Sequence, residues 1–355
     1  NPLSPKVWQD PYFFHSRLRR TAPIFFSRTW QAWWVSEFAL VQEILKSRYF
    51  GASLMPFPER VKRLTQNMSD DRLVRFQNPS MLDLDPPDHT RVRRLAQQGF
   101  LHKFIQSLEP RIRKLVDDNL ESHGNEAEID FVDVLAKPLP AIVIAEMLGL
   151  PRSDHPQFMR WSEELMLGAS TIDPEMIERS DKASSALYLY FKEFSAAKRS
   201  DPGDDLMSQL IQASQASDEA ARLSERELQA TAGLVLAAGF ETTVNLLGNG
   251  IRMLLDTPEH LDTLAARPEL WPTAVEEILR LDSPVQMSAR FARRDVEVAG
   301  TPIERGELVI IYLAGANRDP QVFADPHRFD IERDNAGKHL SFSGGRHFCL
   351  GAALA

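Results

Sequence analysis

One cysteine in a glycine-rich stretch is the residue of this chain best suited to hold a metal. The stretch from Phe342 to Gly351 reads FSGGRHFCLG, and it contains Cys349, the single cysteine among 355 residues. Glycine allows positive φ and close approach of another group. A thiol in such a loop, just before a helical run, lies where backbone N–H dipoles favour the metal-binding thiolate. The pattern indicates a metal-ligating cysteine, and the alternative is a buried structural thiol.

A second stretch places polar groups inside an apolar helix. Ser224 and Glu227 have the spacing of a capping box, and we expect a helix from Leu223 to Leu255. Its middle, LVLAAGFETTVNLLGNG, is apolar nearly all round, which is typical of a helix buried in a large protein. Glu241 and Thr242 interrupt it and are candidates for chemistry.

A third feature is an acid and a base three residues apart. Glu277 and Arg280 lie within a helix expected over Trp271 to Leu281, so their side chains can meet on one face. Alone, such a pair is commonplace and usually solvated, and only its place in the chain makes it informative.

The order of these features resembles that of the cytochrome P-450 family. The cysteine stretch matches the haem-ligand pattern Phe-x-x-Gly-x-x-x-Cys-x-Gly, and the apolar helix and the acid–base pair precede it in family order. Two further stretches also match, Asp85-Pro-Pro-x-His89-Thr-x-x-Arg93 and Ala316-Asn317-Arg318-Asp319-Pro320. The resemblance covers essentially the whole chain.

The resemblance implies a mainly α fold with small β-sheets, the cytochrome P-450 fold. We expect a single haem-thiolate monooxygenase domain over residues 1–355, with a sheet-rich region built from 24–36 and 296–313. Prolines interrupt residues 51–87, which we expect to form a long irregular loop. The chain ends six residues after Cys349, whereas family members continue with a long helix and a terminal sheet. We therefore expect the C-terminal part of the fold to be missing from this sequence.

The resemblance also implies a cofactor, heme b (iron protoporphyrin IX), with Cys349 as its thiolate ligand. The cofactor-binding positions carried over from the motifs are His89, Arg93, Ala238, Gly239, Arg290, Phe342, His347, Cys349 and Gly351. The basic side chains among them would hold the propionates, because buried carboxylates need charged donors. Ala238 and Gly239 would leave a gap in the helix for dioxygen and water. Ser343 stands where the family often has glycine, and we expect it to be tolerated with φ below zero.

Catalytic, structural and substrate roles follow from the same resemblance. Thr242 would lie beside the oxygen-binding face, where its hydroxyl can hydrogen-bond the bound oxygen, and Glu241 would relay protons from solvent. Glu277 and Arg280 would hold the cysteine-loop side of the protein in register. Pocket positions are expected at Met81, Leu82, Leu234, Ala237 and Val285. They are mostly apolar and favour a hydrophobic small molecule, without indicating which molecule or which position is oxidised.

Composition limits the location and the partners. The chain is 43% hydrophobic and 26% charged, as in ordinary soluble globular proteins. It has no uninterrupted run of 18 apolar residues, its start lacks a signal-peptide pattern, and one cysteine excludes intrachain disulfides. These features predict a cytoplasmic protein without a membrane span. The net charge of −9 argues against nucleic acid as the main partner.

The electrons must come from another protein. A single cysteine cannot hold an iron–sulfur cluster, which takes four ligands, and no GxGxxG opens a dinucleotide fold. The resemblance implies a ferredoxin with its ferredoxin reductase. We expect a basic patch that steers an acidic partner, with the members Arg91, Arg93, Arg94, Arg111, Arg113, Lys114 and Arg346. The alternative is that Arg93 binds a propionate and the others form a solvated helix face.

Two other classes compete with the monooxygenase. A cysteine hydrolase would pair Cys349 with a histidine, but it would leave Thr242 and the Glu277–Arg280 pair unexplained. A haem-binding sensor or carrier would not need an acid and a threonine in the apolar helix. Glu241 and Thr242 therefore favour the enzyme.

Overall fold

The computed structural model describes residues 7, 9–66, 68–167, 173–218 and 222–355. The chain divides into two compact units. Unit 1 comprises Asn1–Ser53 and Asn245–Cys349, and unit 2 comprises Leu54–Val244 and Leu350–Ala355. Both sheets of the described chain lie in unit 1. The expected class, mainly α with small sheets, is confirmed, and the expected single domain stays a prediction.

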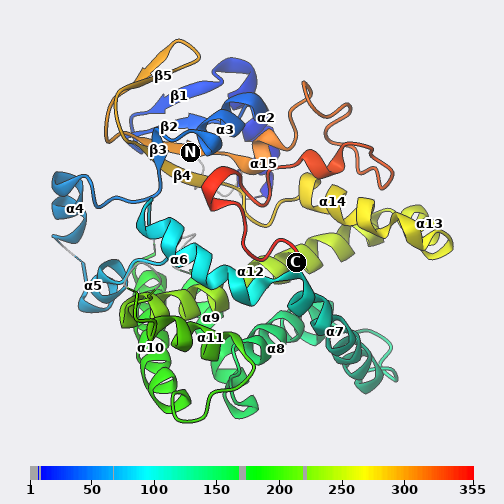
Figure 1. Ribbon diagram of the computed structural model, residues 1–355. Helices are drawn as coiled ribbons and strands as arrows, with labels where there is room; N and C mark the ends of the chain where they lie inside the picture. Colours follow the sequence, from blue (N-terminus) through cyan, green and yellow to red (C-terminus); the bar gives the residue numbers. More distant parts are fainter. Residues whose placement is uncertain (1–6, 8, 67, 168–172, 219–221) are drawn as a thin grey trace. The chain divides into compact units, whose positions relative to one another are not determined.

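The larger sheet of unit 1 has the strand order β1-β2-β7-β4-β3 (Figure 1). β2 and β7 are parallel, with Val35 opposite Ile311, and the other neighbouring pairs are antiparallel. β5 and β6 form a separate antiparallel hairpin. The strands are β1 (Ile24–Ser27), β2 (Ala32–Val35), β3 (Phe50–Gly51), β4 (Ser288–Ala292), β5 (Val296–Val298), β6 (Thr301–Ile303) and β7 (Leu308–Ile311).

The expected sheet segments, 24–36 and 296–313, supply five of these strands, and β3 and β4 lie outside them. β4 reads SARFA, which is short and carries a central arginine, so its own sequence is a weak strand signal. Its pairing with β7, from Ser288 opposite Ile311 to Phe291 opposite Leu308, makes it a strand.

Helix α3 of unit 1 packs on this sheet. Buried residues of α3, β2 and β7 form one apolar cluster that includes Val41, Ile44, Val35, Val309 and Ile311. The helical segments are α2 (Pro11–Thr21), α3 (Phe38–Lys46), α13 (Pro258–Ala266), η5 (Pro268–Leu270), α14 (Trp271–Leu281), α15 (Leu313–Ala316), η6 (Ala336–Lys338) and η7 (Gly345–His347).

Unit 2 is a helical assembly with its own core, which includes Val92, Ile144, Phe191, Leu206 and Leu236. Its segments are α4 (Pro58–Thr65), α5 (Asp70–Gln77), α6 (Asp88–Ala96), η1 (Gln97–Phe100), α7 (His102–Ser122), a π-helical turn η2 (Val132–Ala136), α8 (Pro138–Met147), η3 (Arg152–Asp154), α9 (His155–Leu167), α10 (Pro174–Lys198) and α11 (Leu206–Ser214).

The expected irregular loop over 51–87 is wrong in part, because α4 and α5 form within it. Each helix has only eight residues, which is too short to show a clear apolar period. Pro58 begins α4, where proline is favourable because it needs no N–H partner. α5 packs against α10, and this packing stabilises a helix that would be marginal alone.

The long helix α12 (Glu225–Asp256) is confirmed, and its residues belong to both units. The capping box is present: the backbone N of Glu227 lies 3.3 Å from Ser224 Oγ, and the backbone N of Ser224 lies 2.8 Å from Glu227 Oε2. Leu228, Ala232 and Leu236, four residues apart, are buried in the core of unit 2.

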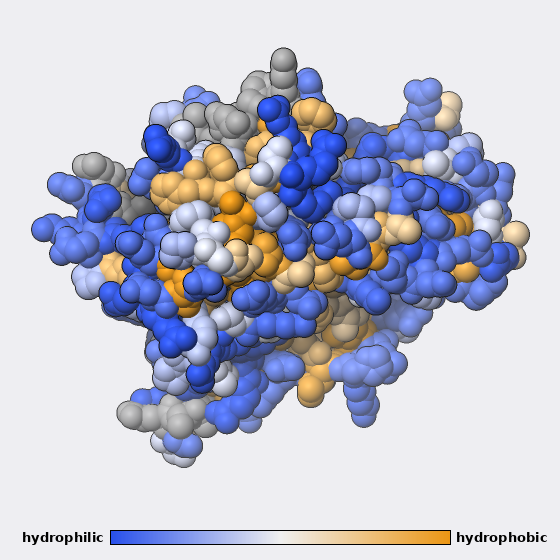
Figure 2. Space-filling model, turned by 90° about the horizontal axis from the view of Figure 1, so that it is seen from above, coloured by the Kyte–Doolittle hydropathy of each residue, from blue (hydrophilic) through white to orange (hydrophobic). Residues whose placement is uncertain are grey.

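Within the described residues, α12 is also the one helix long and apolar enough to cross a membrane. Core helices of soluble proteins can be equally long and apolar. In α12, 44% of the most apolar 18-residue stretch is buried. Figure 2 shows a face of the molecule that is mainly polar, with apolar side chains gathered in places.

Candidate active site

The cysteine loop is closed by a backbone hydrogen bond and packs on α3. Cys349 N donates to Phe342 O over 2.9 Å. Gly345 has φ +64°, and a Cβ there would collide with the carbonyl oxygen of Leu45 at the end of α3. Glycine is therefore required at this position for both conformation and space. The sole cysteine is half-buried on this loop.

The expectation of φ below zero at Ser343 is wrong, because this residue has φ +63°. The left-handed conformation brings the Cβ of an L-residue close to the following carbonyl. The turn before the cysteine places two residues, Ser343 and Gly345, at positive φ, and this requirement for tight turning overrides the preference of serine.

Arg290 presents a buried positive charge in unit 1. It lies on β4 with a 6% exposed side chain, and its Nη1 donates to Ser288 Oγ and Ala289 O. Within the described ranges it forms no ion pair with a carboxylate. Burial lowers the pKa of its guanidinium to about 10. A buried guanidinium is stable only beside an anion or several acceptors, so Arg290 fits a haem propionate.

The remaining basic candidates lie in different elements. His347 is half-buried in η7 of unit 1. His89 and Arg93 lie four residues apart on α6 of unit 2, so they share a face of that helix. His89 is 2% exposed and Arg93 is half-buried.

The candidate catalytic residues occupy the middle of α12. Thr242 donates its hydroxyl hydrogen to Ala238 O over 2.7 Å, and Thr243 makes the same bond to Gly239 O. In this rotamer the Thr242 oxygen can accept a hydrogen bond from a ligand, whereas donating one requires the hydroxyl hydrogen to rotate about the Cβ–Oγ bond and leave Ala238 O. Glu241 is half-buried and Ala238 is exposed.

Gly239 has a packing role that the sequence did not reveal. A Cβ on Gly239 would lie 2.7 Å from the Ile144 side chain of α8. The missing side chain therefore allows α8 to approach α12 closely. Of the two small residues expected to open a gap in the helix, only Ala238 faces open space.

The five expected pocket residues differ in exposure. Met81 belongs to the core of unit 2, and Leu234 packs against that core. Leu82 is 52% exposed and Val285 is 38% exposed. Ala237 is half-buried on α12. Leu234 and Ala237 thus adjoin Ala238 and Glu241 along one helix, whereas Met81 is occupied by core packing.

Glu277 and Arg280 form a fully buried pair in unit 1. Arg280 Nε lies 2.6 Å from Glu277 Oε2, and both side chains are 0% exposed. Glu277 also accepts from Arg333 Nε at 3.0 Å and from Asp330 N at 3.1 Å. One carboxylate therefore serves two guanidiniums.

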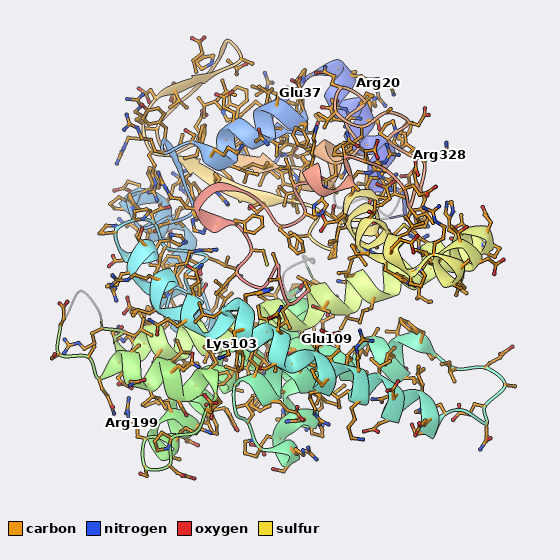
Figure 3. The ribbon with its side chains drawn as sticks, turned by 45° about the vertical axis from the view of Figure 1, so that its right-hand side comes forward. Arg20, Glu37, Lys103, Glu109, Arg199 and Arg328 are labelled. Carbon is orange, nitrogen blue, oxygen red and sulfur yellow. The ribbon has the colours of Figure 1, made fainter. Side chains whose placement is uncertain are left out.

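The two guanidiniums bind the following loop to α14. They donate to backbone carbonyl oxygens of Asn317, Ala324, Asp325, Pro326 and Arg328, the last of which is labelled in Figure 3. Asn317 continues the network, because its Oδ1 accepts from Leu340 N at 2.6 Å and its Nδ2 donates to Ser341 Oγ at 2.8 Å. The network thus ends at the residues that open the cysteine loop.

The sequence did not single out Arg333, which lies 56 residues after Glu277. The signal available was the Ala316–Pro320 motif, which contains Asn317 but does not point to Arg333. The pairing of Glu277 with both Arg280 and Arg333 becomes visible only in the folded structure, because the loop must fold back to bring Arg333 to α14.

The expected basic patch on α6 and α7 is largely neutralised by neighbouring carboxylates. Arg91 pairs with Glu227 and Arg111 pairs with Glu146. Along α7 the exposed pairs are Arg113 with Glu109, labelled in Figure 3, and Lys114 with Asp118. Four of the seven expected cations therefore contribute no net charge.

The thiol loop, the buried cation on β4 and the long apolar helix are the features expected of a haem-thiolate protein. The profile of the Cytochrome P450 family matches residues 57–267 and 268–355. The "Putative cytochrome P450 140" of Mycobacterium tuberculosis is 46% identical over 99% of this chain and 81% of its own length. The "6-deoxyerythronolide B hydroxylase" of Saccharopolyspora erythraea is 36% identical over 98% of this chain and 85% of its own length.

A solved structure, P450BioI in complex with an acyl carrier protein that carries hexadec-9Z-enoic acid, has a TM-score of 0.90 at 34% identity. The two structures match over 99% of this chain and 89% of the P450BioI chain. The chain belongs to the cytochrome P450 family, and it is a monooxygenase of that family.

Proposed function

We propose that this protein inserts one oxygen atom from O2 into a hydrophobic small molecule, with heme b as cofactor and electrons from a separate ferredoxin and ferredoxin reductase. The observation that carries the proposal is the half-buried Cys349 on its glycine loop, together with the buried cation Arg290 in the same unit, which pairs with no carboxylate of the described residues. A thiol ligand and a cation for a propionate are two requirements of a bound haem.

Cys349 would ligate the iron, Arg290 and His347 would hold propionates, and His89 and Arg93 would add donors from α6. When bound, haem supplies the iron that binds and activates dioxygen, and the thiolate favours O–O cleavage. Thr242 would orient the bound oxygen through its hydroxyl, and Glu241 would move a proton from solvent into the apolar middle of α12.

The hydrophobic substrate is supported by the exposed or half-buried positions Leu82, Leu234, Ala237 and Val285. The relative from Saccharopolyspora erythraea is named as a hydroxylase of 6-deoxyerythronolide B, and the P450BioI structure contains an acyl carrier protein that carries hexadec-9Z-enoic acid. A cytoplasmic location is part of the proposal, and the composition of an ordinary soluble globular protein supports it.

A spectrum tests the haem assignment. The reduced protein with carbon monoxide should show the strongly red-shifted Soret band of thiolate ligation, and Cys349→Ser should lose it. Arg290→Met should release haem more readily while the retained haem keeps the band. A Cys349→Ser protein with the thiolate band and full turnover would contradict the proposal.

The charges of unit 1 support a proposal for the surface on which the electron donor would dock. Four exposed cations, Lys46, Arg48, Arg294 and Arg346, form what we term the α3 rim, and none of them pairs with a carboxylate of the described chain. The Cα of Lys46 lies near Gly345, the neighbour of Arg346.

Tyr49 orders two cations of the α3 rim. The guanidinium carbon of Arg294 lies 3.5 Å from the centre of the Tyr49 ring, and that of Arg48 lies 5.0 Å from it. Arg48 also donates to Tyr49 Oη over 3.0 Å. The hydrogen bond from Arg48, followed by the charge of Arg294, lowers the pKa of Tyr49. Unneutralised and pre-ordered cations beside the cysteine loop suit an acidic ferredoxin.

Charge-reversal variants distinguish docking on the α3 rim from docking on the basic patch expected on α6 and α7. Arg48→Glu with Arg294→Glu should slow electron transfer from an acidic ferredoxin about tenfold at low ionic strength, with the difference fading in salt. Arg113→Glu with Lys114→Glu changes the net charge equally and should have little effect. The reverse ranking would place docking on α7.

A further inference from the structure

The acid beside Glu277 points to a second task for α14. The side chain of Glu276 is 43% exposed, whereas that of Glu277 is 0% exposed, so the two neighbouring carboxylates face different surroundings. Glu276 Oε2 lies 3.0 Å from His339 Nε2, a close polar contact although the N–H direction does not meet hydrogen-bond geometry. The side chain of His339 is 2% exposed. The interaction with His339 lowers the pKa of Glu276, and partial burial opposes this shift.

The tautomer of His339 is set by the backbone. Ser341 N donates to His339 Nδ1 over 3.1 Å, so Nδ1 carries the lone pair and the ring hydrogen belongs on Nε2, toward Glu276. The ring thus receives a hydrogen bond on one side and faces a carboxylate on the other. The hydrogen bond from Ser341 and the close contact with Glu276 together favour one orientation of this ring.

This ring contacts the first residue of the cysteine loop. The centroids of the His339 and Phe342 rings are 5.6 Å apart at an interplanar angle of 51°. Phe342 packs on the cluster of Leu246, Met253 and Ile278. Its carbonyl oxygen accepts the hydrogen bond from Cys349 N. Any shift of Phe342 therefore moves the acceptor that closes the loop around the thiol.

We propose that Glu276 and His339 form a positioning pair that orients Phe342 and thereby holds Cys349 in the geometry in which its thiolate binds iron. The link to iron rests on the proposed haem ligation. The pair touches neither the thiol nor the substrate, and it acts through the Phe342 ring and carbonyl. It shares no side chain with the Glu277–Arg280–Arg333 cluster, whose network reaches Ser341 through Asn317.

The test uses the purified haem protein and the variants Glu276→Gln, His339→Phe and their combination. Hydrogen exchange of the Phe342–Cys349 stretch should accelerate about three- to tenfold in each single variant, because the loop opens locally more often. The double variant should exchange no faster than His339→Phe alone, as expected for one shared interaction. In the reduced carbon monoxide complex, the share of haem without the thiolate band should rise severalfold.

Glu269→Gln is the matched control. It removes the same charge from an exposed ion pair with Arg267 in unit 1, and it should leave both measurements unchanged. If His339→Phe fails to fold, the Glu276→Gln variant alone tests the proposal. This variant should fold, because glutamine has nearly the shape of glutamate and the side chain is half-exposed.

The proposal would be overturned if Glu276→Gln showed the same hydrogen-exchange rate in the Phe342–Cys349 stretch, and the same fraction of haem with the thiolate band, as the wild type. A thiolate band that survives in Cys349→Ser would instead reject the haem ligation, while the exchange measurement would still report on the pair.

Discussion

At the scale of single residues, Ser343 combines two unfavourable features. It has φ +63°, and its hydroxyl oxygen is buried without a hydrogen-bond partner in the described chain. Ser343→Gly should raise the free energy of unfolding by about 1 kcal/mol, the strain of the left-handed conformation less the added freedom of the unfolded chain. Ser343→Ala removes the hydroxyl but keeps the strain. Denaturant unfolding should give Ser343→Gly a higher free energy of unfolding than Ser343→Ala. Equal values for the two variants would show that residue 343 is not strained.

Thr242 is the residue whose hydroxyl we expect to matter for oxygen activation. Thr242→Ala should retain haem and substrate binding while product formation falls by a factor of about 10² to 10⁴, typical for losing a proton-transfer group. The missing product should be replaced by hydrogen peroxide. Thr243→Ala is a close control, since Thr243 makes the same bond to the helix backbone. Unchanged coupling of electrons to product in Thr242→Ala would remove this role.

At the scale of elements, the Glu277 cluster binds α14 to the loop that precedes the cysteine. Glu277→Ala would leave the buried charges of Arg280 and Arg333 without their shared carboxylate. We expect a loss of about 3–5 kcal/mol in the free energy of unfolding and haem-deficient protein. Glu332→Gln, which breaks an exposed pair with Arg267, should cost little. Thermal unfolding and haem content measure both, and normal haem with reduced turnover alone would speak against a structural role.

At the scale of the whole molecule, a buried histidine in α2 predicts acid sensitivity. His15 is 3% exposed, and its Nδ1 has no hydrogen-bond partner among the described residues. Burial, followed by the charges of Arg19 and Arg318, lowers its pKa to about 3. The folded protein therefore keeps His15 neutral, whereas the unfolded chain binds a proton below about pH 6.5.

The contribution of His15 is thus complete above pH 6.5 and is lost as the pH falls toward 3. When the pH falls from 7 to 5, protonation of His15 in the unfolded chain should lower the free energy of unfolding by about 2 kcal/mol. Urea titrations at both pH values measure this difference. His15→Phe should reduce the pH dependence by that amount, and His102→Gln, at an exposed histidine, should not. An equal pH dependence in wild type and His15→Phe would show that His15 is not the cause.

Local patterns in the sequence were sufficient where neighbouring residues decide the structure. The capping box and apolar period of α12 predicted its start and length, because both act within one helix. The glycines around Cys349 predicted a tight loop, since backbone conformation is a local property. The family order of the motifs indicated the enzyme class, which the comparisons confirmed. The roles of the individual site residues, and their convergence around one haem, stay predictions.

Only the tertiary structure decided features that depend on distant partners. Arg91 reaches Glu227, 136 residues away, and so loses its place in the expected basic patch. Gly239 meets Ile144, Glu277 gains Arg333, and β4 becomes a strand by pairing with β7. In each case the energy comes from a contact that the folded chain creates. Charge neutralisation, close packing and buried ion pairs therefore cannot be assigned from residue type and spacing alone.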